Sequence, residues 1–177
     1  AKAHLDGGAK RVVISAPAKP ARPDEGGGDS LLGIETATVL MGINEDKLAT
    51  CQITSNASCT TNAGSPVIAI LDETIGIEKA ILNTVHAYTA SQSIVDGPNK
   101  KDFREGRAAA QNIVPSSTGA AIAVTKALPQ LVGKFDGVSM RVPVDAGSIA
   151  DITFISKRPT TAEEVNAILT KAATDPR

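Results

Sequence analysis

Two residue types in this sequence could carry covalent chemistry, and each occurs only twice. Cys51 and Cys59 are the cysteines, and His4 and His86 are the histidines. A thiolate is the reactive form of cysteine, and an imidazole within hydrogen-bond reach can generate it. His4 lies near the chain start, whereas His86 ends an expected strand, so Cys59 and His86 are the candidate nucleophile and base. A lone histidine at a strand end is more often structural, and that alternative stays open.

Cys59 lies in the segment Ser55-Asn-Ala-Ser-Cys-Thr-Thr-Asn62. The apolar residues that follow recur at helical spacing and predict a helix that begins near Ser58. Cys59 would then lie in the first turn, where free backbone N–H groups and the positive end of the helix dipole favour a thiolate. Cys51 has no such neighbours, and we expect it to be a small buried apolar residue.

The composition argues against several classes of protein. The chain has 177 residues, of which 42% are apolar and 21% charged, as in ordinary globular proteins. The net charge of -1 predicts no nucleic-acid or membrane-surface partner. No apolar run approaches the roughly 20 residues of a membrane span, and the start lacks the layout of a secretory signal, so we expect a cytoplasmic protein. Two cysteines and two histidines are too few for a disulfide scaffold or a structural metal site.

The segment before Cys59 has the pattern of the tail of an α/β unit. It predicts, in order, a helix end at Ala1–Leu5, a buried strand at Arg11–Ala16 and short strands at Thr36–Met41 and Thr50–Thr54. Between them, Pro17–Asp29 contains three prolines and three consecutive glycines, which predicts a loop.

The segment after Cys59 predicts a different architecture. Its expected elements are strands at Lys79–His86, Val138–Val142 and Ile149–Ser156, a helix at Gly119–Leu128, and a last helix behind a capping box at Thr160–Glu163. No regular series of helices separates the strands, so we expect an α+β domain, a mixed or antiparallel sheet with helices on one face. The expected domains are residues 1–57, the end of a Rossmann-type α/β dinucleotide-binding domain, and residues 58–177, the catalytic domain.

The block around Cys59 resembles the active-site signature of the phosphorylating glyceraldehyde-3-phosphate dehydrogenases. Further blocks of that family follow in the family's order: Thr84-Val-His-Ala-Tyr-Thr-Ala90, Val95-Asp-Gly-Pro98, Gly106-Arg-Ala-Ala-Ala-Gln-Asn112, Pro115-Ser-Ser-Thr-Gly-Ala-Ala121 and Arg141-Val-Pro143. Several independent blocks in one order are far stronger evidence than any single short motif.

The resemblance implies a reaction. Cys59 would attack the aldehyde of glyceraldehyde 3-phosphate, and His86 would activate the thiol and then take the hydroxyl proton as hydride leaves for the cofactor. Inorganic phosphate would split the resulting thioester to give 1,3-bisphosphoglycerate, a step of glycolysis. The implied cofactor is NAD, with NADP left open, and Ser15 matches a cofactor-contacting serine of the family.

The resemblance also implies two anion sites. Thr89 and Arg141 would hold the substrate's own phosphate, and the attacking phosphate would lie against Ser58, Thr60, Thr118 and Gly119. Arg141 is a forked donor that alternates with apolar neighbours, so we expect it to point away from the core. Many bacterial members carry another phosphate-binding arginine in the loop before Arg107.

That loop departs from the family pattern in this chain. Arg104 is the candidate for the second arginine, and Glu105 beside it would weaken the attacking-phosphate site. The loop at Pro17–Asp29 is longer than is usual in the family. Ala63 stands where many members carry a second cysteine.

The sequence contains no Gly-x-Gly-x-x-Gly after an N-terminal strand, and the family's last strands and final helix are not found either. We therefore expect the isolated chain to lack dehydrogenase activity, whereas acetylation or ester hydrolysis at Cys59 would persist. By resemblance, the whole enzyme is a homotetramer, and the segment before Arg107 and the segment Pro115–Pro143 would line both the subunit contacts and the cofactor site.

Two other functions stay open. Erythrose-4-phosphate dehydrogenases share the cysteine signature, but they typically lack the His-Ala-Tyr-Thr and Ser-Ser-Thr-Gly-Ala-Ala blocks. A non-catalytic interaction module would be favoured if the intact mass of the purified protein equalled that of the 177 residues.

Overall fold

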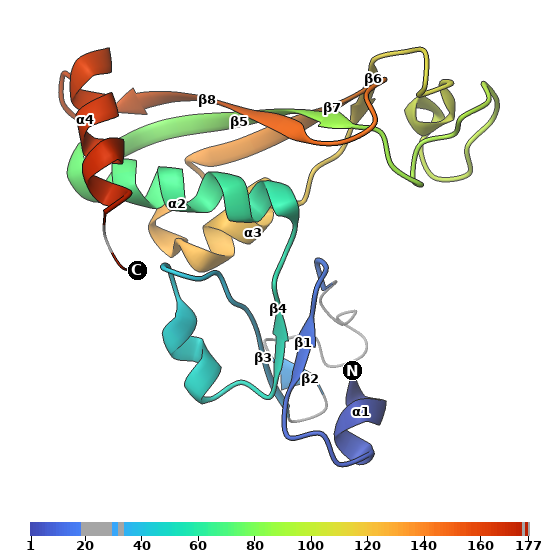
Figure 1. Cartoon of the computed structure of the whole chain (residues 1–177), viewed down its shortest axis with the longest axis horizontal. Helices are drawn as coiled ribbons and strands as arrows, with labels where there is room; N and C mark the ends of the chain where they lie inside the picture. The colour runs from blue at the N-terminus through green and yellow to red at the C-terminus, as the bar shows by residue number, and fades with distance from the viewer. Residues whose placement is uncertain (19–29, 32–33, 175, 177) are drawn as a thin grey trace.

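The computed structural model describes residues 1–18, 30–31, 34–174 and 176. Two four-stranded sheets form its framework, and Figure 1 shows α2 leading from one to the other. The elements in chain order are α1 (Lys2–Asp6), β1 (Val12–Ile14), β2 (Ser30–Leu31), β3 (Ile34–Thr38), η2 (Glu45–Ala49), β4 (Ile53–Ser55), α2 (Cys59–Thr74), β5 (Ile77–Ala87), η3 (Phe103–Gly106), β6 (Val114–Ser116), α3 (Ala120–Ala127), η4 (Pro129–Leu131), β7 (Phe135–Val142), β8 (Ser148–Ser156) and α4 (Ala162–Ala172).

The first sheet has the strand order β1-β4-β3-β2. Both β1 and β3 run parallel to the central strand β4, and β2 pairs antiparallel with β3. Parallel neighbours agree with the expected α/β pattern. The expectation of a buried first strand was wrong, because β1 lies at the sheet edge and Val13 is 68% exposed. The expected loop at Pro17–Asp29 lies outside the described residues, apart from its first two.

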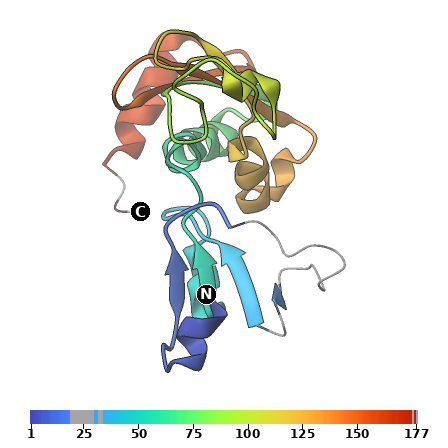
Figure 2. The same ribbon diagram turned by 90° about the vertical axis from the view of Figure 1, so that its right-hand side faces the viewer.

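The second sheet is mixed, which confirms the expected α+β architecture. Its strand order is β6-β7-β5-β8, with β5 parallel to β7 and antiparallel to β8. Helices α2 and α3 cover one face of this sheet, and α4 lies at one end of it (Figure 1; Figure 2). The core between the helices and the sheet includes Ile68, Leu71, Leu82, Val124 and Leu131, each at most 2% exposed.

The other face of the second sheet is open and carries many apolar side chains, beside the polar residues Asn83, Asp136 and Asp151. Its exposed side chains include Ile81 (45%), Val138 (44%), Met140 (39%), Ile149 (69%) and Ile155 (56%). On β7, the alternation of apolar and polar residues predicted that the apolar side chains face the core, and this prediction was wrong. Ser139, which is 4% exposed, lies on the helix-covered side, while the apolar residues face outward.

Arg141 shares the face of Ser139, because side chains two apart on a strand point the same way. The expectation that Arg141 points away from the core was thus wrong. It lies on the core side of the sheet, and it is half-buried because it stands near the end of β7.

The last helix begins one residue later than expected. Thr161 caps α4, and its side-chain oxygen accepts a hydrogen bond from the N–H of Glu164 at 3.2 Å. Thr160 instead donates to the Glu164 carboxylate at 2.7 Å. The hydrogen bond from Arg158, and to a smaller extent the hydrogen bond from Thr160, lowers the pKa of the Glu164 carboxyl group.

The two faces of β5 give a direct test of this packing. Leu82→Ala should lower the free energy of unfolding by about 2–5 kcal/mol, because it leaves a cavity under α2 and α3. Ile81→Ala, one residue earlier on the open face, should cost less than about 1 kcal/mol in the dissociated chain, since that side chain is 45% exposed there. Urea unfolding of both variants measures the difference, and equal losses would contradict the assignment of faces.

Candidate active site

Cys59 is the first residue of α2, as the sequence predicts. Ser58 caps the helix, and its side-chain oxygen accepts from the N–H of Thr61 at 3.1 Å. The Cys59 side chain is exposed. Cys59 therefore lies in the first turn of a 16-residue helix, at the positive end of the helix dipole.

The turn that presents Cys59 is strained and is held from two sides. Ala57 has a φ of 55°, in the left-handed region that non-glycine residues seldom adopt. Its N–H donates to Ser55 Oγ at 3.1 Å. The side-chain amide of Asn62 donates to the carbonyls of Asn56 at 2.7 Å and Ser58 at 2.9 Å. Sequence reasoning assigned no role to Asn62, although this residue closes the signature block.

His86 reaches Cys59 from the end of β5. Its Nε2 lies 3.4 Å from Cys59 Sγ, across 27 positions of sequence. The structure therefore brings together the pair that the sequence singles out. A sulfur and a ring nitrogen at this distance can exchange a proton directly.

Arg141 lies beside His86 on the neighbouring strand β7, where the two residues are register partners. Its Nη1 is 2.8 Å from His86 Nδ1 and 3.0 Å from the carbonyl oxygen of Ala87. Its Nε is buried and has no partner among the described residues. The residue expected to hold a substrate phosphate is thus in contact with the imidazole.

Thr89 is held by a buried residue that the sequence did not single out. The Oε1 of Gln92 accepts from the Thr89 N–H at 2.9 Å and from its hydroxyl at 3.2 Å. Gln92 is 4% exposed, and its amide nitrogen donates to the carboxylate of Glu105 and to Ser116 Oγ. No local pattern marks Gln92, because its partners Glu105 and Ser116 come from distant segments.

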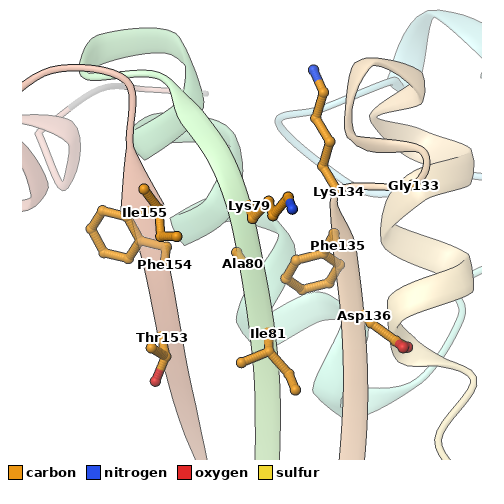
Figure 3. A pocket seen from close by; sticks show the side chains of 10 residues that line it. All are labelled: Lys79, Ala80, Ile81, Gly133, Lys134, Phe135, Asp136, Thr153, Phe154 and Ile155. Atoms are coloured by element: carbon orange, nitrogen blue, oxygen red, sulfur yellow. The ribbon is translucent and has the colours of Figure 1, made fainter.

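A hollow of about 810 Å³ lies between these segments. Its lining carries charges of both signs. The positive side chains are Arg141, Lys100 and Lys101, and the negative ones are Asp102 and Glu105. Another hollow, of about 430 Å³, lies near the start of β5 (Figure 3), and its lining contains no cysteine or histidine.

The four residues expected around the attacking phosphate lie at two helix starts. Ser58 and Thr60 belong to the beginning of α2, and Gly119 is the N-cap of α3. Thr118 Oγ1 accepts from the N–H of Ala120 at 3.1 Å. Figure 1 shows both helices beginning at the same end of the second sheet, where β5 ends.

Arg104 is bound to its own loop. Its Nε donates to Asp102 at 3.0 and 3.1 Å, and its Nη2 does so at 2.5 Å. These hydrogen bonds lower the pKa of Asp102 and raise that of Arg104. Both groups are solvent-screened, so the pair adds little to stability.

Ser15 is exposed and directly follows β1. The N–H of Asn56 donates to the carbonyl of Ile14 at 2.9 Å, so the end of β1 lies against the turn before Cys59. In open α/β sheets, ligands bind at this carboxyl edge of the parallel strands.

Within the described residues, no three His, Cys, Asp or Glu side chains gather as a metal site. None of the helices in those residues is long and apolar enough to cross a membrane.

Comparison with known proteins gives consistent matches. The family model described as "Glyceraldehyde 3-phosphate dehydrogenase, C-terminal domain" matches residues 58–176. The glyceraldehyde-3-phosphate dehydrogenase of Streptomyces coelicolor is 49% identical over 177 residues, which is 99% of this chain and 48% of the relative. That of Mycobacterium avium is 47% identical over 174 residues, 98% of this chain and 47% of the relative. The chain therefore spans about half the length of the curated relatives it matches.

The two hydrogen bonds of the Asn62 side chain around Ala57, which we call the clamp, can be tested by Asn62→Leu. This change removes the donor to the Asn56 carbonyl and one of two donors to the Ser58 carbonyl, which still accepts from the backbone N–H of residue 62, and should cost about 1 kcal/mol of stability. It should also slow alkylation of Cys59 by iodoacetamide at least about tenfold, because the thiol loses its fixed position.

Asn112→Leu is the matched control. Asn112 donates to the carbonyls of Arg107 and Ala108, and Ala108 also has a positive φ of 37°. This variant should lose stability without any change in the alkylation rate of Cys59. If Asn62→Leu alkylated as fast as Asn112→Leu, the clamp would not position the thiol.

Proposed function

The chain belongs to the glyceraldehyde-3-phosphate dehydrogenase family, and on that premise we propose that its protein oxidises and phosphorylates glyceraldehyde 3-phosphate. The observation that carries the proposal is the 3.4 Å contact between Cys59 Sγ and His86 Nε2 at the start of a helix. The product is 1,3-bisphosphoglycerate, and this glycolytic role would place the protein in the cytoplasm.

In the first step, Cys59 Sγ attacks the aldehyde carbon. His86 Nε2 takes the thiol proton as the C–S bond forms, and it then gives this proton to the carbonyl oxygen, which yields a thiohemiacetal. His86 then accepts the hydroxyl proton as the C–H bond breaks, which leaves a thioester on Cys59. NAD, when bound, accepts the hydride, and the exposed hydroxyl of Ser15 beside the Cys59 turn fits a contact to it.

In the second step, an oxygen of inorganic phosphate attacks the thioester carbonyl. The C–S bond breaks and Cys59 leaves as a thiolate, which the start of α2 stabilises. Ser58, Thr60, Thr118 and Gly119 are the proposed donors to this phosphate, since helix starts bind anions. Arg104 is the proposed additional cation, although its bonds to Asp102 occupy it in this state.

The substrate's own phosphate is proposed to bind Arg141 and Thr89. Support comes from the buried Nε of Arg141, which has no partner among the described residues. The Glu105 carboxylate lines the same hollow and is bound to Gln92. Its negative charge opposes any anion in that hollow, so we expect Glu105 to weaken binding of the substrate's phosphate there as well as of inorganic phosphate.

We also propose that the open apolar face of the second sheet packs against another copy of the chain in a homotetramer. Apolar side chains from three adjacent strands are exposed on this face, among them Val138, Met140 and Ile149. A contiguous apolar patch of this kind marks a protein interface.

The nucleophile can be tested with p-nitrophenyl acetate. Cys59→Ala should abolish the burst of acetylation, and His86→Asn should slow it by about 10²–10⁴-fold, the usual contribution of a general base. Cys51→Ala, which alters the buried cysteine, should leave the burst unchanged. A full burst in Cys59→Ala would exclude Cys59 as the nucleophile.

The assembly proposal predicts that Met140→Glu combined with Ile149→Glu weakens self-association at least about tenfold, because charges would be buried at the interface. Sedimentation velocity over a range of concentrations measures this change. Thr170→Glu adds a charge to the exposed side of α4 and should leave association unchanged. An unaltered oligomer in the double variant would rule out this face.

A further inference from the structure

The side-chain amide of Gln92 is buried between two segments that border the proposed phosphate site. Gln92 is 4% exposed. Its Oε1 accepts from the N–H of Thr89 at 2.9 Å and from the Thr89 hydroxyl at 3.2 Å. Its Nε2 donates to the carboxylate of Glu105 and, at 3.4 Å, to Ser116 Oγ. The amide therefore uses its full hydrogen-bonding capacity inside the protein, because its oxygen accepts twice and its nitrogen donates twice.

The oxygen of this amide fixes the position of Thr89. Thr89 follows the end of β5 by two residues and is exposed, so packing contributes little to its position. The backbone N–H of Gln92 also donates to the Thr89 carbonyl at 3.0 Å. An anion that binds Thr89 therefore meets a residue whose position is set in advance, which lowers the entropy cost of binding.

The nitrogen of the amide holds a carboxylate that lines the same hollow as Arg141. Within the described residues, the side-chain hydrogen bond recorded for Glu105 is the one from Gln92. Both Glu105 and Arg141 belong to the lining of the 810 Å³ hollow. A Glu105 side chain released from Gln92 is free to turn toward the guanidinium of Arg141, where its charge competes with that of a bound phosphate.

We propose that Gln92 is a positioning residue for the substrate's phosphate, which fixes Thr89 with its amide oxygen and restrains the Glu105 carboxylate with its amide nitrogen. The inference rests on the proposed roles of Thr89 and Arg141 in binding that phosphate. When the phosphate binds, the Thr89 hydroxyl turns its proton from Gln92 to a phosphate oxygen. The Thr89 N–H keeps its bond to Oε1, so the residue stays in place.

This role concerns the phosphate of the substrate and leaves the aldehyde untouched. Among the described residues, the side-chain hydrogen bonds of Gln92 go to Thr89, Glu105 and Ser116, and none goes to Cys59 or His86. Loss of the amide should therefore weaken binding of an aldehyde that carries a phosphate and spare an aldehyde that lacks one. A merely structural role would affect both aldehydes alike.

Protection of Cys59 from iodoacetamide in phosphate-free buffer measures this contrast in the chain itself. An aldehyde protects the thiol because Cys59 Sγ adds to the carbonyl carbon while the thiol proton passes to the carbonyl oxygen, and the thiohemiacetal has no free thiol. Glyceraldehyde 3-phosphate and glyceraldehyde share this aldehyde and differ in the phosphate. In Gln92→Met we expect the half-protecting concentration of glyceraldehyde 3-phosphate to rise at least about tenfold and that of glyceraldehyde to stay within about twofold.

Gln130→Met is the matched control, because it removes another bond between a glutamine amide and a carboxylate. Gln130 is exposed, and its Nε2 donates to Asp72 at 3.1 Å. This variant should leave both half-protecting concentrations unchanged. Adding Glu105→Gln to Gln92→Met should lower the half-protecting concentration of glyceraldehyde 3-phosphate at least about threefold, because the released side chain then has no charge.

Gln92→Asn is the second variant, in case Gln92→Met does not fold. It keeps the amide but is one methylene shorter, so it cannot hold Thr89 and Glu105 together, and it should show the same selective loss at about three- to tenfold. Equal losses of protection by the two aldehydes in a folded variant would overturn the inference, as would unchanged protection by glyceraldehyde 3-phosphate in Gln92→Asn. If the unsubstituted protein showed no preference for glyceraldehyde 3-phosphate over glyceraldehyde, the proposed phosphate site itself would be refuted.

Discussion

The rest of the structure depends on one contact, between Cys59, the first residue of α2, and His86, the tenth residue of β5. A helix of 16 residues is about 24 Å long, and a strand covers that distance in roughly seven or eight residues. The chain must therefore reverse sharply after α2 and run back along the underside of the helix. Gly76 provides the reversal with a φ of 72°, and an added Cβ there would lie 2.8 Å from the Lys157 side chain. The length of α2 and this glycine together bring His86 to Cys59.

Much of this architecture could be predicted from local sequence. The helix of Cys59 and the strand of His86 follow from periodicity, and the last helix follows from its capping box, signals that depend only on neighbouring residues. The face of β7 could not be predicted in the same way. Alternation tells which side chains share a face, but not whether that face meets helices or solvent. On β7 the apolar set faces outward, so the pattern alone assigned it to the wrong side.

The parts of the site that sequence reasoning missed are the polar contacts of two side-chain amides, between distant segments for Gln92 and within one turn for Asn62. Gln92 links Thr89 to Glu105 and Ser116, and Asn62 links the helix to the strained turn before it. A buried amide must find partners, because an unpaired one costs free energy. The sequence shows neither that Gln92 is buried nor where its partners come from. Asn62 belongs to the signature block, but its role became visible only in the structure. Its side chain bonds the carbonyls on either side of Ala57, the residue with a positive φ.

The end of β5 supplies both the proposed base of the reaction and a residue proposed to bind the substrate's phosphate. His86 and the Ala87 carbonyl end β5, and Thr89 follows two residues later in the turn that Gln92 holds. Arg141 joins the two from β7, because it contacts the imidazole and also lines the adjoining hollow. Its guanidinium cannot bind an incoming anion fully while it remains against Nδ1, since one group cannot direct the same N–H bonds at two partners. The imidazole and the proposed phosphate donor are therefore in direct contact, and any movement of the Arg141 side chain toward the hollow changes the contacts of His86.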